Sequence, residues 1–119
     1  PIRLFVLSKF VLSSLRNGAN NEAADAARRA LVALESVADD SFWEVARFRA
    51  LLGAALSAGG DLDEAGAMLE RGVAGLEATR GADHPWTRWA LAQLGEHRAR
   101  VEESGSENDP EPPAAPGGP

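Results

Sequence analysis

The feature that most constrains this chain is an internal repeat of 42 residues. The 119-residue sequence, shifted by 42 positions, can be laid on itself without a gap. The matching segments are Asn17-Gly18 with Gly59-Gly60, Asn21-Glu22-Ala23 with Asp63-Glu64-Ala65, Leu34-Glu35 with Leu76-Glu77, and Leu52-Gly53 with Leu94-Gly95. The identities are few, but they fall at turns and at small or apolar positions. A period in this range is typical of a stacked array of helices.

Each unit of the repeat is expected to fold as two antiparallel helices. Glycines at 18, 59–60 and 81 mark the helix ends, and about one residue in five is Ala, which favours helix. Apolar residues with the spacing of one buried helix face run from Ala23 to Val37, and again from Ala65 to Leu76. The sequence predicts helices near 2–16, 20–37, 42–58, 62–79 and 84–103.

Three helix starts carry capping signals. Ser41 with Glu44 forms a capping box, and Asp61 with Glu64 forms an acidic version of it. Asp83 is expected to cap the last helix, with Pro85 in its first turn, where a missing N–H is harmless.

A family resemblance follows from these positions. The pairs Leu52-Gly53 and Leu94-Gly95, the small residues Ala65 and Gly72, and the linker Arg80-Gly-Ala-Asp-His-Pro85 resemble the tetratricopeptide repeat, in its kinesin-light-chain-like 42-residue form. The resemblance covers about residues 1–103. It implies an all-α fold, a short right-handed stack of antiparallel helix hairpins, with units at about 1–40 and 41–82 and a half unit at 83–103.

The resemblance also implies a function, which is protein–protein interaction through a concave groove. The predicted partner-binding residues are Arg47, Ala50, Ala54 and Ser57 of the third helix and Trp89, Ala92 and Glu96 of the fifth, with Phe5, Ser8 and Leu12 of the first helix beside them. Ala54 and Gln93 stand where related repeats often carry amides, so clamping of a terminal carboxylate is not expected. The expected ligand is a helix or an extended apolar segment, with Trp89 as its anchor and Arg47 as a charge pair.

A second interpretation stays open. The sequence also resembles C-terminal arrays of some large bacterial Ser/Thr kinases and regulators. The chain would then be a structural or regulatory segment that binds nothing itself.

Composition excludes several other classes of function. Cys is absent, which removes disulfides and thiol chemistry, and outside residues 101–119 the charges nearly balance, so no basic field indicates nucleic acid. The apolar stretch 4–15 is too short to cross a membrane. We find no catalytic set, cofactor motif or small-molecule site, and we expect a cytoplasmic binding protein that is not an enzyme.

Two patterns resemble metal sites only superficially. Residues 61–72 imitate part of a calcium loop, but Ala65 and Gly72 stand at two ligand positions. His84 and His97 lie about 20 Å apart along one helix, so they cannot share a metal. We expect His84 to be hydrogen-bonded near a helix start and His97 to be solvated.

The remaining expectations concern the tail and individual side chains. Residues 104–119, rich in Pro, Gly and acids, are predicted to be disordered. Close helix crossings are expected at Gly53, Gly72 and Gly95, whereas Gly66 and Gly75 have no such explanation. Leu52, Leu69, Leu76 and Leu94 are expected to be buried at helix crossings. Trp43 is expected to be buried as well. Trp89 is either core or an exposed anchor.

Overall fold

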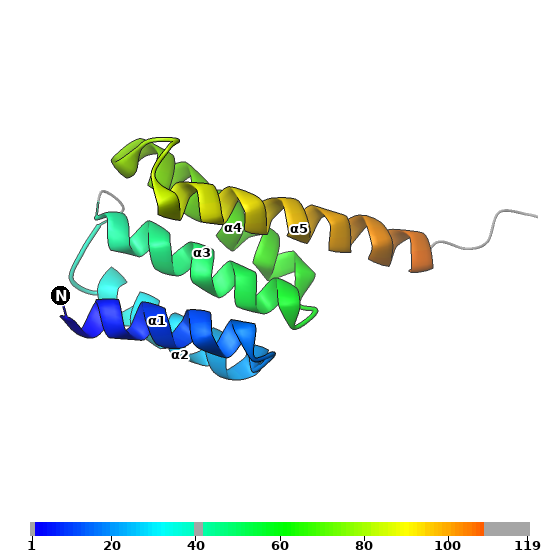
Figure 1. Ribbon diagram of the computed structural model, residues 1–119, viewed down its shortest axis with the longest axis horizontal. Coiled ribbons are helices and arrows are strands. Elements are labelled where there is room, and N and C mark those ends of the chain that lie inside the picture. Colours follow the sequence, from blue (N-terminus) through cyan, green and yellow to red (C-terminus); the bar gives the residue numbers. More distant parts are fainter. Residues whose placement is uncertain (1, 40–41, 109–119) are drawn as a thin grey trace, which may run out of the picture.

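The computed structural model describes residues 2–39 and 42–108, and this part of the chain forms five helices (Figure 1). They are α1 (Ile2–Arg16), α2 (Asn20–Glu35), α3 (Trp43–Ala58), α4 (Leu62–Arg80) and α5 (Pro85–Asn108). The all-α class and the five predicted helices are therefore confirmed. Helix α5 continues to Asn108, so residues 104–108 are helical, although the sequence predicted disorder from 104. The rest of the predicted tail and the capping residue Ser41 lie outside the described residues.

Glycines end three of the helices. Gly18, Gly60 and Gly81 have φ values of 77°, 94° and 89°. This left-handed conformation is readily available only to glycine, and it reverses the chain after a helix. The predicted punctuation by glycine is confirmed at these positions.

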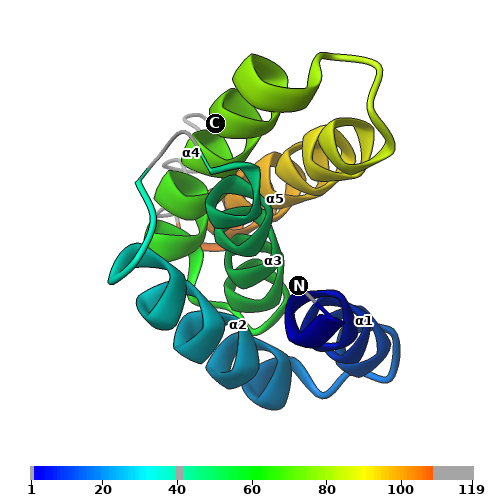
Figure 2. The same cartoon turned by 90° about the vertical axis from the view of Figure 1, so that its left-hand side faces the viewer.

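The helices pack as adjacent pairs around α3. Each helix contacts the next one along the chain, and α3 also contacts α1 and α5. Figure 2, viewed close to the helix axes, shows α2 and α4 on one side and α1 and α5 on the other, with α3 between them. Within the described ranges, no Cα atom of α1 lies within 8 Å of a Cα atom of α5. The candidate site lies in the space between these two helices.

Helix α3 is the central element because almost its whole surface is covered. Every residue from Val45 to Ser57 is buried. The segment can be buried all round because most of its side chains are Ala, Leu or Phe. Burial of Leu52, Leu69, Leu76 and Leu94 at helix contacts is confirmed. Val37, predicted on the buried face of the second helix, is instead 82% exposed, because α2 ends at Glu35.

Two of the three predicted glycine crossings are confirmed. A methyl group on Gly72 would lie 2.7 Å from the backbone nitrogen of Ala50, and one on Gly53 would lie 2.7 Å from Cγ of Leu69. With glycine at these two positions, α3 and α4 lie closer together than alanine would allow. The prediction for Gly95 is wrong, because no described atom of another helix lies within 4 Å of a methyl group at that position.

The two glycines without an expected role also lie at contacts. A methyl group on Gly75 would lie 2.6 Å from Cβ of Ala46, and one on Gly66 would lie 3.1 Å from Nε2 of His97. Gly75 therefore extends the close approach of α3 and α4, and Gly66 makes room for a side chain of α5.

The start of α4 differs from the predicted capping box. Asp61 precedes the helix, but its side chain makes no capping hydrogen bond. Glu64 instead accepts two hydrogen bonds from Arg28 of α2, at 2.8 and 3.0 Å. The predicted box is wrong, because a cation from another helix pairs with its second carboxylate.

Candidate functional site

A groove lies between α1 and α5, with α3 as its floor. Its first part is a cavity of about 530 Å³, and a second cavity of about 320 Å³ continues from it along the same helices. Leu12 and Arg16 of α1 line both cavities, and Leu12, Trp86 and Trp89 line a smaller hollow between them. We call this surface the α1–α5 groove. Its further lining residues are Phe5, Ser8, Lys9, Leu15, Trp43, Arg47, Ala54, Ala58, His84, Pro85, Gln93, Glu96 and Arg100.

The groove exists because α1 and α5 both pack on α3 while their backbones stay apart from each other. Helix α3 contributes Trp43 and Arg47 to the first cavity and the small residues Ala54 and Ala58 to the second. Long side chains from α1 and α5 then form the walls. The arrangement is concave and combines apolar side chains with polar and charged groups, as binding sites often do.

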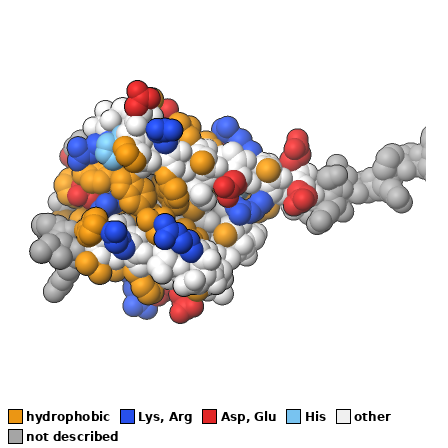
Figure 3. Space-filling model, viewed as in Figure 1, with side chains coloured by type: hydrophobic (Ala, Val, Ile, Leu, Met, Phe, Trp, Pro, Cys, Tyr) orange, Lys and Arg blue, Asp and Glu red, His pale blue; other side chains and the backbone are white. Residues whose placement is uncertain are grey.

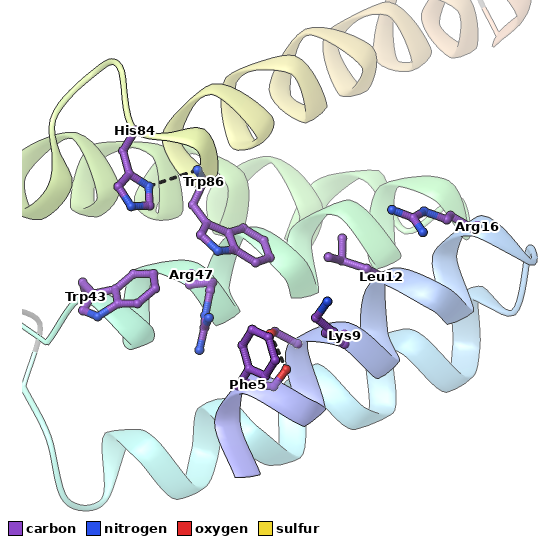
Figure 4. A pocket seen from close by; sticks show the side chains of 9 residues that line it. Phe5, Lys9, Leu12, Arg16, Trp43, Arg47, His84 and Trp86 are labelled. Atoms are coloured by element: carbon purple, nitrogen blue, oxygen red, sulfur yellow. Dashed lines mark hydrogen bonds between the residues drawn. The ribbon is translucent and has the colours of Figure 1, made fainter. Parts of the chain in front are cut away.

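Arg47 occupies the inner end of the first cavity among aromatic rings. Its guanidinium carbon lies 4.6 Å from the ring centre of Trp43 and 5.4 Å from that of Trp86 (Figure 4). The residue is only 4% exposed, and burial lowers the pKa of Arg47 from its ordinary value, against the opposing charge of Glu44. Its Nε has no hydrogen-bond partner in the part of the chain that the structure describes. Cation–π attraction therefore holds this cation at the base of the cavity.

The two tryptophans of α5 form an aromatic wall. Trp86 and Trp89 meet edge to face, with ring centres 5.4 Å apart. The backbone N–H of Trp86 donates a hydrogen bond of 3.1 Å to Nδ1 of His84, drawn as a dashed line in Figure 4. His84 thus caps α5, where the sequence predicted Asp83, and the expected hydrogen bond of His84 near a helix start is confirmed. Trp43, expected to be buried, is half-buried, with its ring centre 6.0 Å from that of His84.

The groove carries more positive than negative side chains. Lys9, Arg16, Arg47 and Arg100 line it, and Glu96 is the one acid among the described lining residues. The carboxylate of Glu96 lies 3.9 Å from the guanidinium of Arg100, which partly offsets its negative charge. Figure 3 shows apolar side chains in the hollow, with cationic side chains on the α1 side below it. The chain as a whole has a net charge of −6, so the groove differs in sign from the rest of the protein.

The structure brings together only some of the predicted partner-binding residues. Arg47 lines the first cavity, and Ala54, Trp89 and Glu96 line the second. Of the residues expected beside them on the first helix, Phe5, Ser8 and Leu12 all line the groove.

Three other predicted residues lie away from the groove walls. Ala50 is fully buried, and its backbone faces Gly72 of α4. Ser57 is buried in a contact with α5, and Ala92 is exposed on α5 outside both cavities. The helix register placed all seven residues on two helices, but the positions of the neighbouring helices decide which of them line the groove.

The hydrogen-bonding partners of Ser57 correct one prediction. His97, expected to be solvated, is 5% exposed, and its Nδ1 lies 3.0 Å from Oγ of Ser57. Arg100 donates a hydrogen bond of 2.9 Å to the same oxygen, which leaves the hydroxyl hydrogen of Ser57 free to bind His97. A hydroxyl so enclosed cannot reach a substrate, so the cluster joins α3 to α5 rather than forming a nucleophile.

A periodic signal could have located His97. It follows the buried Ala90 and Leu94 at the i, i+4, i+7 positions of one helix face. The charged neighbours Glu96 and Arg98 masked this register. Lys9 and Arg16, four and eleven residues after Phe5, could likewise have been placed beside Leu12 by helical spacing.

Metal-like and membrane-like patterns are not found in the described ranges. Among residues 2–39 and 42–108, no three His, Asp or Glu side chains gather where they could hold a metal ion. None of the helices described there combines the length and apolar character needed to cross a bilayer.

Comparison with known proteins gives no family. No protein-family model matches this chain, and a search of curated proteins finds no significant match.

Proposed function

We propose that this chain is a protein-interaction module, a short tetratricopeptide-like helical array that holds a segment of a partner protein in the α1–α5 groove. The observation that carries the proposal is the groove itself, because α1 and α5 pack on α3 and leave the space between them open. The 42-residue sequence repeat and the sequential pairing of the helices support the array.

The lining of the groove supports a partner segment that is apolar and acidic. Trp86, Trp89 and Leu12 offer apolar surface that is suited to an apolar side chain of a helix or an extended segment. Aromatic side chains of this kind often contribute most of the binding energy. The cations Lys9, Arg16 and Arg100 surround this surface and favour a segment that also carries carboxylates.

A random peptide library displayed on phage and selected against the full chain tests this function. Selected peptides are then titrated by calorimetry against the parent and against three variants. Trp89→Ala is expected to weaken binding by at least about 1 kcal/mol, because it removes an anchor. If Trp89→Ala binds like the parent but melts at a much lower temperature, Trp89 is a core residue and the ligand binds elsewhere.

Charge reversals separate the groove from general electrostatics. Arg16→Glu in the groove is expected to weaken binding about tenfold, which corresponds to about 1.4 kcal/mol. Arg71→Glu is the matched control, because Arg71 is an exposed cation of α4 outside the groove. Selection of no peptide at all, or equal losses in both variants, would favour the alternative of a structural segment that binds nothing in this groove.

A further inference from the structure

A second apolar surface lies on a different side of α1. Val6 and Phe10 are 56% and 49% exposed, and they border a cavity of about 660 Å³ against Ala26 and Ala33 of α2. We call this surface the α1–α2 face. It shares no lining residue with the α1–α5 groove. Exposed side chains of this size, gathered beside a cavity, call for a physical explanation.

The internal repeat shows what happens at the equivalent positions. A shift of 42 residues takes Val6 to Phe48 and Phe10 to Leu52, and a second shift takes them to Ala90 and Leu94. All four equivalent side chains are buried. The side chains at these two positions are therefore buried in the second and third units and exposed only in the first.

In the second and third units, the second helix of the preceding unit covers the two side chains at these positions. Phe48 and Leu52 belong to one buried cluster with Ala27, Leu31 and Leu34 of α2. In the next unit, Ala90 and Leu94 belong to a cluster with Leu69, Val73 and Leu76 of α4. The two covering triplets are themselves 42 residues apart and have the i, i+4, i+7 spacing of one helix face.

An ion pair marks the position of the covering helix in the second unit. Arg28, one residue after Ala27, donates both hydrogen bonds to Glu64 of α4. The residue equivalent to Glu64 is Glu22, which lines the α1–α2 face and is exposed. A helix bound there with a cation at the same position would meet the Glu22 carboxylate.

We infer that the α1–α2 face binds an amphipathic helix with apolar residues at i, i+4 and i+7 and a cation at i+1, the pattern that α2 itself presents to α3 and α4. The occupant is a helix of a partner with that chemistry. A second copy of the folded chain fits less well, because its own Ala27, Leu31 and Leu34 are buried and cannot be presented to a neighbour.

The defined probe is a helix-stabilised synthetic peptide of residues 19–37, added to the ¹⁵N-labelled full chain. Amide shifts are expected at Val6, Phe10, Ala26 and Ala33. Shifts confined to the residues of α3 that contact α2 would mean that the peptide replaces α2, and would overturn the inference. The absence of any shift at about 1 mM peptide would overturn it as well.

Two matched variants locate the binding surface. Phe10→Asp is expected to raise the Kd of a fluorescent form of the peptide by at least about tenfold. Phe5→Asp changes a side chain of the same type and helix that is 57% exposed but lines the groove, and it is expected to change the Kd less than about twofold. Equal losses in the two variants would overturn the assignment.

A charge exchange tests the orientation of the helix. Glu22→Arg in the chain is expected to weaken binding of the peptide. A peptide with Glu in place of its Arg28 is expected to restore binding to this variant. If the charge-exchanged peptide does not regain affinity for the Glu22→Arg variant, the peptide lies in another register. The orientation inferred from the pair of Arg28 and Glu64 is then overturned. Sedimentation of the chain alone that shows a dimer abolished by Phe10→Asp would assign the face to a second copy instead.

Discussion

The hydroxyl of Ser57 on α3 and the imidazole of His97 on α5 face each other at 3.0 Å in a buried contact. They lie 40 residues apart in the chain, and Arg100 donates a further hydrogen bond to the same hydroxyl. This polar cluster lies where α5 packs on α3, directly behind the second cavity of the groove, which Arg100 also lines.

Removal of the hydroxyl is expected to destabilise the fold. Ser57→Ala leaves Nδ1 of His97 buried without a partner, which costs about 1–3 kcal/mol. Ser13→Ala, at an exposed serine of α1, is the control and should change stability by less than about 0.5 kcal/mol. Urea unfolding measures both. The combination of Ser57→Ala with His97→Leu should cost less than the sum of the single changes, because no imidazole is then left unpaired. Strict additivity would show that the two residues do not interact.

Alanine substitutions at two helical glycines are expected to act in opposite directions. Gly72→Ala places a methyl group 2.7 Å from the backbone of Ala50, so α3 and α4 must move apart, at a cost of about 1–3 kcal/mol. Gly95→Ala meets no described atom of another helix within 4 Å and should stabilise α5 by about 0.5–1 kcal/mol through helix propensity. Thermal unfolding followed by circular dichroism compares the pair. A stable Gly72→Ala variant would mean that the contact of α3 and α4 is looser than described.

Leu76 reports on the core between α4 and α5. It is fully buried, so Leu76→Ala should cost about 2–5 kcal/mol through lost burial and a cavity. A domain of this size often has only about 5 kcal/mol of stability, so the variant should be largely unfolded. Val32→Ala, on the exposed side of α2, is the control and should lie within about 0.5 kcal/mol of the parent. An unchanged melting curve for Leu76→Ala would contradict the helix register.

The ion pair of Arg28 and Glu64 predicts a dependence of stability on pH. The hydrogen bonds from Arg28 lower the pKa of Glu64 from its ordinary value. A carboxylate whose pKa is lowered by folding contributes stability above its unfolded pKa of about 4.3, and this contribution disappears as the pH falls through the folded pKa.

Glu64→Gln tests this dependence. Both side chains of the pair are more than one third exposed, so the loss at pH 7 should be about 0–1 kcal/mol and should shrink in high salt. Once the pH lies below the folded pKa of Glu64, the variant and the parent should be equally stable. Glu70→Gln, at an exposed glutamate of the same helix, is the control. Denaturant titrations at several pH values measure the effect, and a gap that persists at low pH would contradict this explanation.

Deletion of residues 109–119, a segment that lies outside the described residues, tests whether it contributes to the fold. The segment contains no large apolar side chain, so its removal should leave helical circular dichroism and the melting temperature nearly unchanged. A loss of several degrees would show that the segment packs against the helices.

The sequence by itself determined the elements of this fold. Helical periodicity, small-residue spacing and the glycines at 18, 60 and 81 are local signals, because each depends on neighbours within a few residues. They placed the five helices and identified Leu52, Leu69, Leu76 and Leu94 as core. The repeat also indicated that the first, third and fifth helices share one surface, and Phe5, Leu12, Trp89 and Glu96 do line the groove.

Only the tertiary structure decided which side chains reach that surface. Burial of Arg47 depends on rings from two helices, burial of His97 on the space beside Gly66, and the pairing of Glu64 on a cation 36 residues away. Sequence periodicity cannot supply such information, because it gives the direction of a side chain from its own helix but not what the neighbouring helix places there. The exposure of Phe10 has the same cause. Its equivalents Leu52 and Leu94 are covered by the second helix of the preceding unit, and in the described structure no such helix lies over Phe10.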